Sequence, residues 1–460
     1  MHWPLSLSPL QHAMFVLVGL LSYVMVTRIG GHHRHPSAAI AWVLLIALLP
    51  YLGLPLFLVF GTRKLVRPAR RVSRTDRAPS CEGPGWALQL LAALDVPQPV
   101  RNRSIEFHED GAESLRALLE IVGRARERVD VCTYVIGDDS IGEAVLAALV
   151  QSAQRGVRVR VLLDAIGGLR GARRAVAMLH ATGVELRWFM PVLRNPARGR
   201  TNLRDHRKLV VADGCAMWSG GRNLAAEYFD DGDGGWIDLS FVARGPLARQ
   251  AQALLERDWQ AAHGRVAASG GFADDIGAGL FDGPPAQLVP SGPDLADDTL
   301  YALLVAAAFR AERRIVAVTP YFVPEDALLA AWCVACRRGV RIDLLVPSRS
   351  NHRMADLARG RALRALAAAG GHVHLHPAMI HAKLVIVDDE IALCGSANLD
   401  SRSLLLNFEL MTAFYGRDQI DWLREWAERQ FRRAHAYQPQ HPSWGRDVLE
   451  GFVRAVGFQL

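Results

Sequence analysis

The sequence predicts an α/β protein made of two related halves, preceded by two apolar helices. Three observations lead to this prediction. A short polar frame occurs twice, strand and helix patterns alternate in the same order around each copy, and two long uncharged runs precede the first copy. Because alternating strands and helices form sheets covered by helices, we expect two tandem α/β sandwich domains related by a pseudo-twofold axis, with a site on their seam.

Two apolar runs near the N-terminus predict a membrane anchor within residues 1–62. Residues 1–27 contain no Lys, Arg, Asp or Glu, and Ala13–Val26 is mostly apolar. Ala38–Phe60 is the stronger candidate, because 23 uncharged residues are long enough to cross a bilayer. A cleaved signal peptide fits poorly, since no Lys or Arg precedes the first run. We therefore expect two transmembrane helices.

Positive charge is denser after the second apolar run than before it. Residues 28–37 hold two Arg and three His, and we interpret His32, His33 and His35 as a solvated loop rather than a metal site. Six basic residues crowd the other flank, at Arg63, Lys64, Arg67, Arg70, Arg71 and Arg74. This asymmetry predicts that the bulk of the chain lies on the cytoplasmic side of the membrane. The flank and the net charge of +7 also suit an anionic membrane surface.

The composition divides the rest of the chain. Residues 63–99 form a basic linker rich in Pro, Gly and Ser, interrupted by a short helix, Trp86–Leu94, expected near the membrane or the first half. We expect a first domain at 100–275, a second at 276–440 and a tail at 441–460. Apolar residues recur in the tail at helical spacing, so it either lies at the membrane interface or packs on the core; they are Trp444, Val448, Leu449, Phe452, Val456 and Phe458.

Strands and helices alternate in the same order in both halves. Hydrophobic periodicity predicts, in the first half, helices at 112–128, 141–155 and 172–182 and strands at 129–136, 157–164 and 184–189. In the second half it predicts helices at 300–313, 325–338 and 354–369 and strands at 315–318, 340–347 and 372–376. Each series leads into one copy of the polar frame.

The polar frame starts at His206 and again at His381. In both copies the His is followed by Lys at the second position, by Asp after four more residues, and then by a small-residue turn and Asn. Residues 206–224 and 381–399 are identical at eight of 19 positions, which include every polar member of the frame. Such agreement indicates an internal duplication.

Each frame is predicted to lie on a buried strand. The uncharged, β-branched runs after Lys208 and Lys383 end at Asp213 and Asp388, where a tight turn leads into a second strand. Residues i and i+2 of a strand share a face, so each His should lie beside its Lys. The turn position indicates that the two Asp residues hold the hairpin rather than transfer protons.

Two such copies would place two imidazoles on opposite sides of one phosphate. One His would attack phosphorus, and the other would protonate the leaving alkoxide and then deprotonate the incoming hydroxyl. Lys208, Lys383, Asn223 and Asn398 would bind the non-bridging oxygens. This chemistry requires no metal, and we expect no cofactor.

Two further carboxylates are candidates for orienting the histidines. A nucleophilic imidazole needs its far nitrogen fixed by a partner. Asp238, in Trp-Ile-Asp, and Glu409, in Asn-Phe-Glu, could supply it. The alternative for each is an acid in a turn or on the surface.

The doubled frame resembles the signature of the phospholipase D superfamily, and its surroundings resemble bacterial cardiolipin synthases. The resemblance rests on residues 202–208, 290–294, 319–324, 395–403 and 407–409. It implies an enzyme of a bacterial inner membrane that transfers a phosphatidyl group between two phosphatidylglycerol molecules through a phosphohistidine and releases glycerol. It also implies that His206 is the nucleophile, that His381 is the acid and base, and that Asp213 and Asp388 count with the catalytic frame.

Several alternatives stay open. Residues 376–380 depart from the Tyr and the Gly-Phe pair usual in cardiolipin synthases, which leaves the acceptor lipid undecided between phosphatidylglycerol and another such as phosphatidylethanolamine. A hydrolytic phospholipase D would use the same residues, and an inactive membrane scaffold is an alternative of another class. A nuclease, and with it a nucleic-acid partner, is disfavoured because apolar runs precede the frames and aromatic residues are not interleaved with basic ones. The sequence leaves the oligomeric state undecided.

Overall fold

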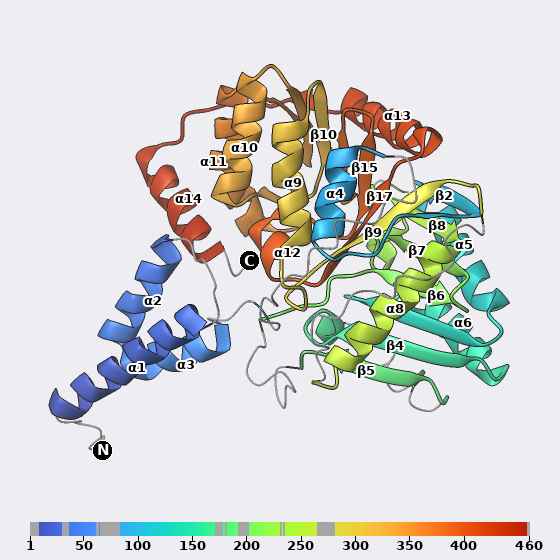
Figure 1. The fold of residues 1–460 in the computed structure, drawn as a ribbon, viewed down its shortest axis with the longest axis horizontal. Coiled ribbons are helices and arrows are strands. Elements are labelled where there is room, and N and C mark those ends of the chain that lie inside the picture. Colours follow the sequence, from blue (N-terminus) through green and yellow to red (C-terminus); the bar gives the residue numbers. More distant parts are fainter. Residues whose placement is uncertain are drawn as a thin grey trace.

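The computed structural model describes residues 9–29, 36–60, 64, 83–170, 178–179, 182–191, 202–230, 232, 235–264 and 281–457. It has a body of two stacked halves and a group of N-terminal helices beside it (Figure 1). The halves are α/β and lie in tandem, as the sequence predicts. Most of the predicted helix at 172–182 and the His cluster at 32–35 lie outside the described residues.

The N-terminal region contains three packed helices, α1 (Pro9–Ile29), α2 (Pro36–Leu48) and α3 (Pro50–Phe60). The prediction of one continuous helix over Ala38–Phe60 is therefore wrong. Pro50 has no N–H to continue the helix and disfavours the helical conformation of the residue before it, so α2 ends there. Within the described residues, no helix combines the length and the apolar character needed to cross a membrane.

Lys64 joins the segment after α3 to the second half. Its ammonium is buried, donates to the carbonyls of Gly292 and Asp297, and lies 2.8 Å from the carboxylate of Asp298. Its place in the basic flank suggested that Lys64 faces lipid headgroups. The structure shows instead that its ammonium is buried in the protein. The other five residues of that flank lie outside the described residues.

The linker helix α4 (Gly85–Ala93) packs on the second half and not on the first half, which was one of the two expected positions. Ala87, Leu88 and Leu91 of α4 share an apolar core with α9 (Thr299–Arg310). The short strand β1 (Val100–Arg101) then pairs with β9 (Pro285–Ser291) of the second half. Two elements that precede the first half in the sequence, α4 and β1, thus pack against the second half.

The first half contains a seven-stranded sheet in the order β2-β8-β7-β6-β3-β4-β5. The strands are β2 (Ser104–His108), β3 (Arg128–Thr133), β4 (Arg158–Asp164), β5 (Glu185–Phe189), β6 (Leu209–Ala212), β7 (Ala216–Gly220) and β8 (Ser240–Arg244). Helices α5 (Gly111–Arg124) and α6 (Ser140–Gln154) pack on one face, and α8 (Pro246–Ala261) packs on the other. Two short 3-10 helices, Gly167–Arg170 and Ala226–Tyr228, lie in its loops.

The second half repeats this arrangement. Its strands run in the order β9-β17-β15-β14-β10-β12-β13, and the sheet is extended by β1 and β18 (His435–Ala436). They are β10 (Arg314–Val318), β12 (Arg341–Pro347), β13 (His372–His376), β14 (Leu384–Val387), β15 (Ile391–Gly395) and β17 (Glu409–Phe414). The parallel and antiparallel pairings match those of the first sheet strand for strand, which confirms the predicted duplication.

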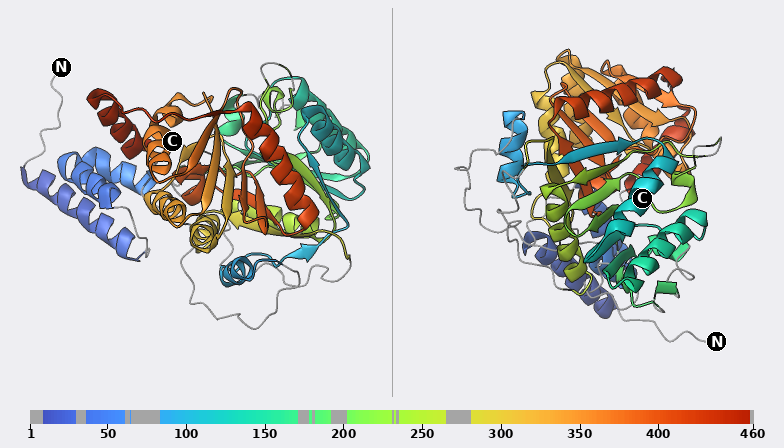
Figure 2. Two further views of the ribbon diagram at one scale, coloured as in Figure 1. Left: turned by 90° about the horizontal axis from the view of Figure 1, so that it is seen from above. Right: turned by 90° about the vertical axis from the view of Figure 1, so that its right-hand side faces the viewer.

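Helices cover the outer face of the second sheet (Figure 2), and strands of both sheets contribute to one shared apolar core. The covering helices are α9, α10 (Asp326–Arg337) and α11 (Arg353–Ala368). Between the sheets, α8 and α13 (Arg417–Arg433) share one apolar core with strands of both halves. The remaining elements are the paired strands β11 (Phe322–Val323) and β16 (Leu399–Asp400), and the helices α12 (Ser401–Leu405) and α14 (Trp444–Gly457).

Candidate active site

The two His-x-Lys segments lie just before equivalent strands, β6 and β14, on the seam between the halves. Backbone hydrogen bonds join each segment to the opposite half. The N–H of His206 donates to the carbonyl of Phe408 at 2.9 Å, and the N–H of His381 donates to the carbonyl of Ile237 at 2.7 Å. The seam therefore fixes the position of both histidines.

Each imidazole bonds to a carboxylate from the other half. Nδ1 of His206 lies 3.0 and 3.1 Å from the two carboxylate oxygens of Glu409. Nδ1 of His381 lies 2.6 Å from Oδ2 of Asp238. An ionised carboxylate can only accept, so each Nδ1 carries the proton, and the lone pair of each neutral imidazole is on Nε2.

Both carboxylates are held in the ionised form. Burial opposes ionisation of Glu409, but His206 and the hydrogen bond to it outweigh burial and lower the pKa. Burial also opposes ionisation of Asp238, but Lys383 and His381 outweigh it and lower the pKa to about 2. These are the two carboxylates that the sequence named as candidates for orienting the histidines, although it did not show which histidine each would bind.

The small-residue turns of the two frames support the carboxylates. Ser396 Oγ donates to Glu409 at 2.5 Å, and the equivalent first-half residue is Gly221. A Cβ at Gly221 would lie 2.1 Å from Oδ1 of Asp238, so only glycine leaves room for that carboxylate. Each turn thus lies against the carboxylate of its own half.

The lysines lie beside their histidines, as the spacing predicted. Lys208 Nζ donates to the carbonyl of His206 at 2.7 Å, and Lys383 Nζ lies 2.7 Å from Nδ1 and 2.9 Å from Nε2 of His381. Burial lowers the pKa of Lys208 to about 7 and that of Lys383 to about 8. Burial first, and Lys383 second, lower the pKa of His381 to about 3, and burial also lowers the pKa of His206. An anion bound here would oppose all of these shifts.

The aspartates of the frame, Asp213 and Asp388, lie away from the histidines. Both have positive φ, +50° and +51°, and both accept hydrogen bonds from three consecutive backbone N–H groups. The donors are residues 126–128 for the first and 312–314 for the second. This geometry ties the hairpin to the preceding strand and agrees with a hairpin-holding role.

Both imidazoles line one cavity of about 630 Å³. Its wall is built by the loops that follow the parallel strands β3, β4, β10 and β12, where ligands of α/β proteins commonly bind. Asn223 and Asn398 also line it, whereas the lysines lie behind the wall and are each 1% exposed. The carbonyl oxygens of both asparagines are buried and lack a hydrogen-bond partner within the described residues, so the wall offers acceptors as well as donors.

Aromatic residues that the sequence did not single out surround the imidazoles. The ring of Tyr134 lies 5.2 Å from that of His206, and Tyr228 and Trp236 lie 5.0 and 5.3 Å from that of His381. The sequence signal that could have identified Tyr228 and Trp236 was their position a few residues before Asp238. These rings limit access of water to the histidines.

Two residues at equivalent positions of the duplicated halves bring opposite charges to the cavity. Glu227 stands 21 residues after His206, and Arg402 stands 21 residues after His381. Both line the cavity. Arg402 bonds to the carbonyl of Asn202, just before the first frame, at 2.8 Å. The backbone of Glu227 bonds to Trp236, beside His381. Arg402 is thus tied to the segment that leads to His206, and the backbone of Glu227 is tied to Trp236.

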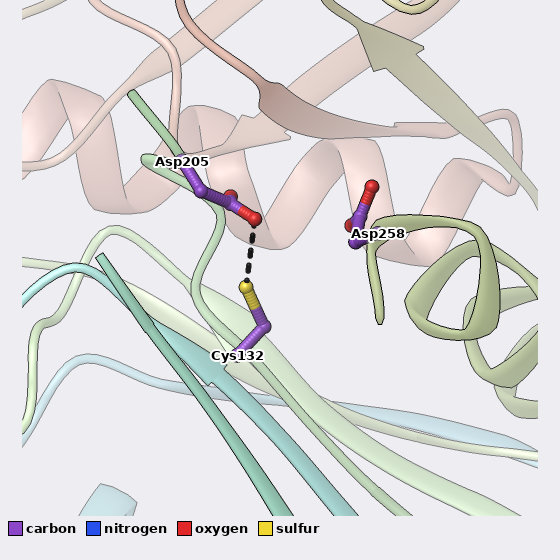
Figure 3. A group of neighbouring side chains, drawn as sticks. All are labelled: Cys132, Asp205 and Asp258. Atoms are coloured by element: carbon purple, nitrogen blue, oxygen red, sulfur yellow. Dashed lines mark hydrogen bonds between the residues drawn. The ribbon is translucent and has the colours of Figure 1, made fainter. Parts of the chain in front are cut away.

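A buried cluster behind the cavity contains Cys132, Asp205 and Asp258 (Figure 3). Their ligand atoms lie within 4.8 Å of one another, a spacing that could hold a metal ion. However, the guanidinium of Arg207 already bonds to Asp258, and the thiol of Cys132 donates to Asp205 at 3.3 Å. A metal ion would meet the buried positive charge of Arg207, so the residues fit an anchor for that arginine better than a metal site. Arg207 also donates to the carbonyl of Glu409 at 3.1 Å.

Two families match this chain. Residues 118–259 and 304–431 match the family described as "Cardiolipin synthase, PLD-like domain". Residues 15–61 match the family described as "Phospholipase_D-nuclease N-terminal".

Relatives and solved structures agree with these matches. Cardiolipin synthase A of Pseudomonas aeruginosa is 30% identical over 463 residues, which cover 95% of this chain and 93% of that protein. Cardiolipin synthase 2 of Bacillus cereus is 29% identical over 413 residues, which cover 84% of this chain and 79% of that protein. The crystal structure of phosphatidylserine synthase from Haemophilus influenzae has a similar fold, with a TM-score of 0.64 and 16% identity over 81% of this chain and 98% of that one.

Proposed function

Since this chain belongs to the cardiolipin synthase family, whose domain is phospholipase D-like, we propose that it converts two molecules of phosphatidylglycerol into cardiolipin and glycerol. The names of its relatives support this phosphatidyltransferase activity. The observation that carries the proposal is the crossed pairing of two histidines with two buried carboxylates at one cavity.

In the first half-reaction, Nε2 of His206 attacks the phosphorus of one phosphatidylglycerol. The N–P bond forms as the P–O bond to glycerol breaks, and the leaving oxygen takes a proton from His381. Glu409 stabilises the positive charge that develops on His206. The carboxylate of Glu227, which also lines the cavity, can accept hydrogen bonds from the glycerol hydroxyls.

In the second half-reaction, the terminal hydroxyl of another phosphatidylglycerol replaces glycerol. His381, now neutral, takes its proton, the new P–O bond forms, and the N–P bond to His206 breaks. Asp238 stabilises the imidazolium formed at His381. One phosphodiester replaces another, so the exchange needs no nucleotide. Water is the competing acceptor, and the aromatic residues around the imidazoles oppose its entry.

Lys208 and Lys383 hold the non-bridging oxygens of the phosphate, together with amide groups of Asn223 and Asn398. The buried ammonium groups support this role, because an anion between them offsets their mutual repulsion. The same anion raises the pKa of His381 toward the range in which it can donate a proton. Asp213 and Asp388 act through the hairpins and transfer no proton.

Residues 1–62 anchor the chain at a bacterial inner membrane, with the catalytic part on the cytoplasmic side. The N-terminal family match and the exposed apolar side chains of α1 support this anchor. Those side chains are Leu10, Met14, Phe15, Leu17, Val18, Leu21, Val24 and Met25. The domain limits of 100–275 and 276–440, with a linker at 63–99 and a tail at 441–460, belong to the same proposal. These limits are supported by the two sheets, because β2 to β8 form one sheet and most of the later strands form the other. Only β1, which precedes β2, belongs to the second sheet.

The test uses the purified full chain in vesicles of phosphatidylglycerol, with and without phosphatidylethanolamine, followed by mass analysis of the lipids and a glycerol assay. Cardiolipin and glycerol should appear in equal amounts. Phosphatidic acid as the main product would instead indicate a hydrolase, and a mixed phosphatidylethanolamine product another acceptor. His206→Ala and His381→Ala should each abolish transfer in a folded, membrane-bound chain, and turnover retained by either variant would refute the two-histidine scheme.

A further inference from the structure

The C-terminal helix α14 carries an exposed apolar face. Trp444, Val448 and Leu449 are 85%, 53% and 49% exposed. Residues 444 and 448 are one helical turn apart, so their side chains lie along one side of the helix. The opposite side is buried, with Glu450 2% and Val453 6% exposed. The predicted tail helix thus packs on the core with one side. Its exposed apolar side chains, Trp444, Val448 and Leu449, are called the apolar strip below.

A buried ion pair fixes which side of α14 faces outward. The carboxylate of Glu450 lies 2.6 Å from the guanidinium of Arg364 on α11 and 3.1 Å from that of Arg446. Gly360 of α11 makes room for it, because a Cβ there would lie 2.9 Å from Oε1 of Glu450. The helix therefore cannot roll to bury its apolar strip without leaving this carboxylate unpaired.

The helix that holds α14 also forms part of the cavity wall. The cavity is lined by Ala355 and Ala358 of α11 and by Asn351 and His352 just before it. Helix α14 is therefore held, through Gly360 and Arg364, by the same helix that lines the cavity at Ala355 and Ala358. The N-terminal helices lie at the same end of the molecule as α14 (Figures 1 and 2).

The start of α11 adds positive charge to this edge. Arg349, Arg353 and Arg361 are exposed on α11 and the loop before it. Clustered basic residues attract the surface of an anionic bilayer, and large apolar side chains, Trp above all, favour its interfacial zone. Exposed apolar side chains of α14 and exposed basic side chains of α11 thus belong to two packed helices, one of which lines the cavity that we assign to anionic lipids.

We propose that α14 and the start of α11 form a docking edge for an anionic bilayer surface, with Trp444, Val448 and Leu449 inserted among the headgroups. Docking there brings the cavity to the level at which a phosphatidylglycerol headgroup can enter it without leaving the bilayer. The inference rests on the proposed function in taking phospholipids as substrates.

The first test measures contact with lipid independently of activity. The full chain is reconstituted in phosphatidylcholine vesicles, with and without phosphatidylglycerol, that contain a lipid with a quencher on its acyl chain. An environment-sensitive dye is attached at Val448→Cys or, as a matched control, at Phe309→Cys. Phe309 is 55% exposed and lies at the end of α9, just before the amino end of β10, whereas the cavity lies at the carboxyl ends of the parallel strands. The exposed Cys215 is replaced by Ser in both, and a parent without the added cysteine gives the background.

We expect quenching at position 448 to exceed that at 309 severalfold and to rise with the content of phosphatidylglycerol. Equal quenching at both positions would overturn the proposal. So would a spectral change at 448 that depends on protein concentration without lipid, since a second copy of the chain would then cover the strip.

A second test uses the ratio of turnover in vesicles to turnover in detergent micelles. The triple variant Trp444→Ser, Val448→Ser, Leu449→Ser should lower this ratio about tenfold, chiefly by raising the phosphatidylglycerol fraction needed for half-maximal rate. Phe309→Ser should leave the ratio unchanged. An unaltered ratio in the triple variant would refute the docking edge, whereas a parent chain that forms no cardiolipin in micelles would refute the proposed function instead.

Discussion

Replacement of Glu409 by Gln tests the crossed pairing most directly. The variant keeps the size of the side chain and removes its charge. Glu409 accepts hydrogen bonds from His206, Ser396 and Asn407. A glutamine has one oxygen and one NH2 group, so it cannot accept all three, and its NH2 would face a donor. Nδ1 of His206 then loses the partner that keeps its proton there.

The expected loss follows from the hydrogen bond that disappears. A hydrogen bond to a charged group contributes about 1.5–3 kcal/mol. Since about 1.4 kcal/mol corresponds to a factor of ten in rate, formation of the phosphohistidine should slow about 10- to 150-fold. The residue is fully buried, so water cannot easily replace the carboxylate.

Two substrates separate the roles of the two histidines. Phosphatidylglycerol needs a protonated leaving group, whereas phosphatidyl-p-nitrophenol releases an anion that needs no proton. Glu409→Gln should slow the cleavage of both substrates, because it weakens the nucleophile. Asp238→Asn should slow phosphatidylglycerol cleavage and largely spare release of nitrophenol. Glu390→Gln, at an exposed position, is the matched control, and thermal unfolding checks the fold of each variant.

A rate within threefold of the parent for Glu409→Gln, in a chain of unchanged stability, would refute the role assigned to this carboxylate. The reverse pattern, with Asp238→Asn slow on both substrates and Glu409→Gln slow only on phosphatidylglycerol, would make His381 the nucleophile.

Three further predictions concern the lysines, the small-residue turn and the hairpin aspartates. Because burial lowers the pKa of Lys208 to about 7 and of Lys383 to about 8, both lose positive charge as the pH rises through this interval. Binding of tungstate, a phosphate analogue, should weaken about tenfold or more between pH 6.5 and 9 by calorimetry, and a flat profile would contradict this. Gly221→Ala should slow phosphatidylglycerol turnover at least about tenfold, because its Cβ displaces Asp238, whereas Gly123→Ala, with open space around it, should not; equal rates in a kinetic assay would argue against the steric reasoning. Asp388→Ala leaves three backbone N–H groups without an acceptor and should lower the free energy of unfolding by about 2–4 kcal/mol while turnover per folded molecule persists; loss of turnover at unchanged stability would assign Asp388 to the chemistry.

The sequence predicted the frame residues well because their relations are local. The spacing of His206 and Lys208, or of His381 and Lys383, fixes which side chains share a side of an extended segment, whatever surrounds it. The turn position of Asp388 likewise indicated its structural role. The repeated order of strands and helices was readable for the same reason, since hydrophobic period reports on each element separately.

Some predictions were wrong because a tertiary contact or a single proline determines the structure at that place. The run Ala38–Phe60 divides at Pro50, whose missing N–H counts for more than the continuous apolar character around it. Helix α4 packs on the second half, although it precedes the first along the chain. The composition of α4 shows that the helix has an apolar face, but it does not show which half that face packs against.

The sequence by itself determined that two halves each bring an imidazole and an ammonium, and it identified Asp238 and Glu409 as candidates for orienting the imidazoles. Only the tertiary structure decided that Glu409 serves His206, 203 residues away, and that Asp238 serves His381, 143 residues away. Local pattern cannot choose between partners at such separations, because the choice depends on how the two sheets pack against each other. The backbone bonds across the seam make that choice, and with it they place both imidazoles at one cavity.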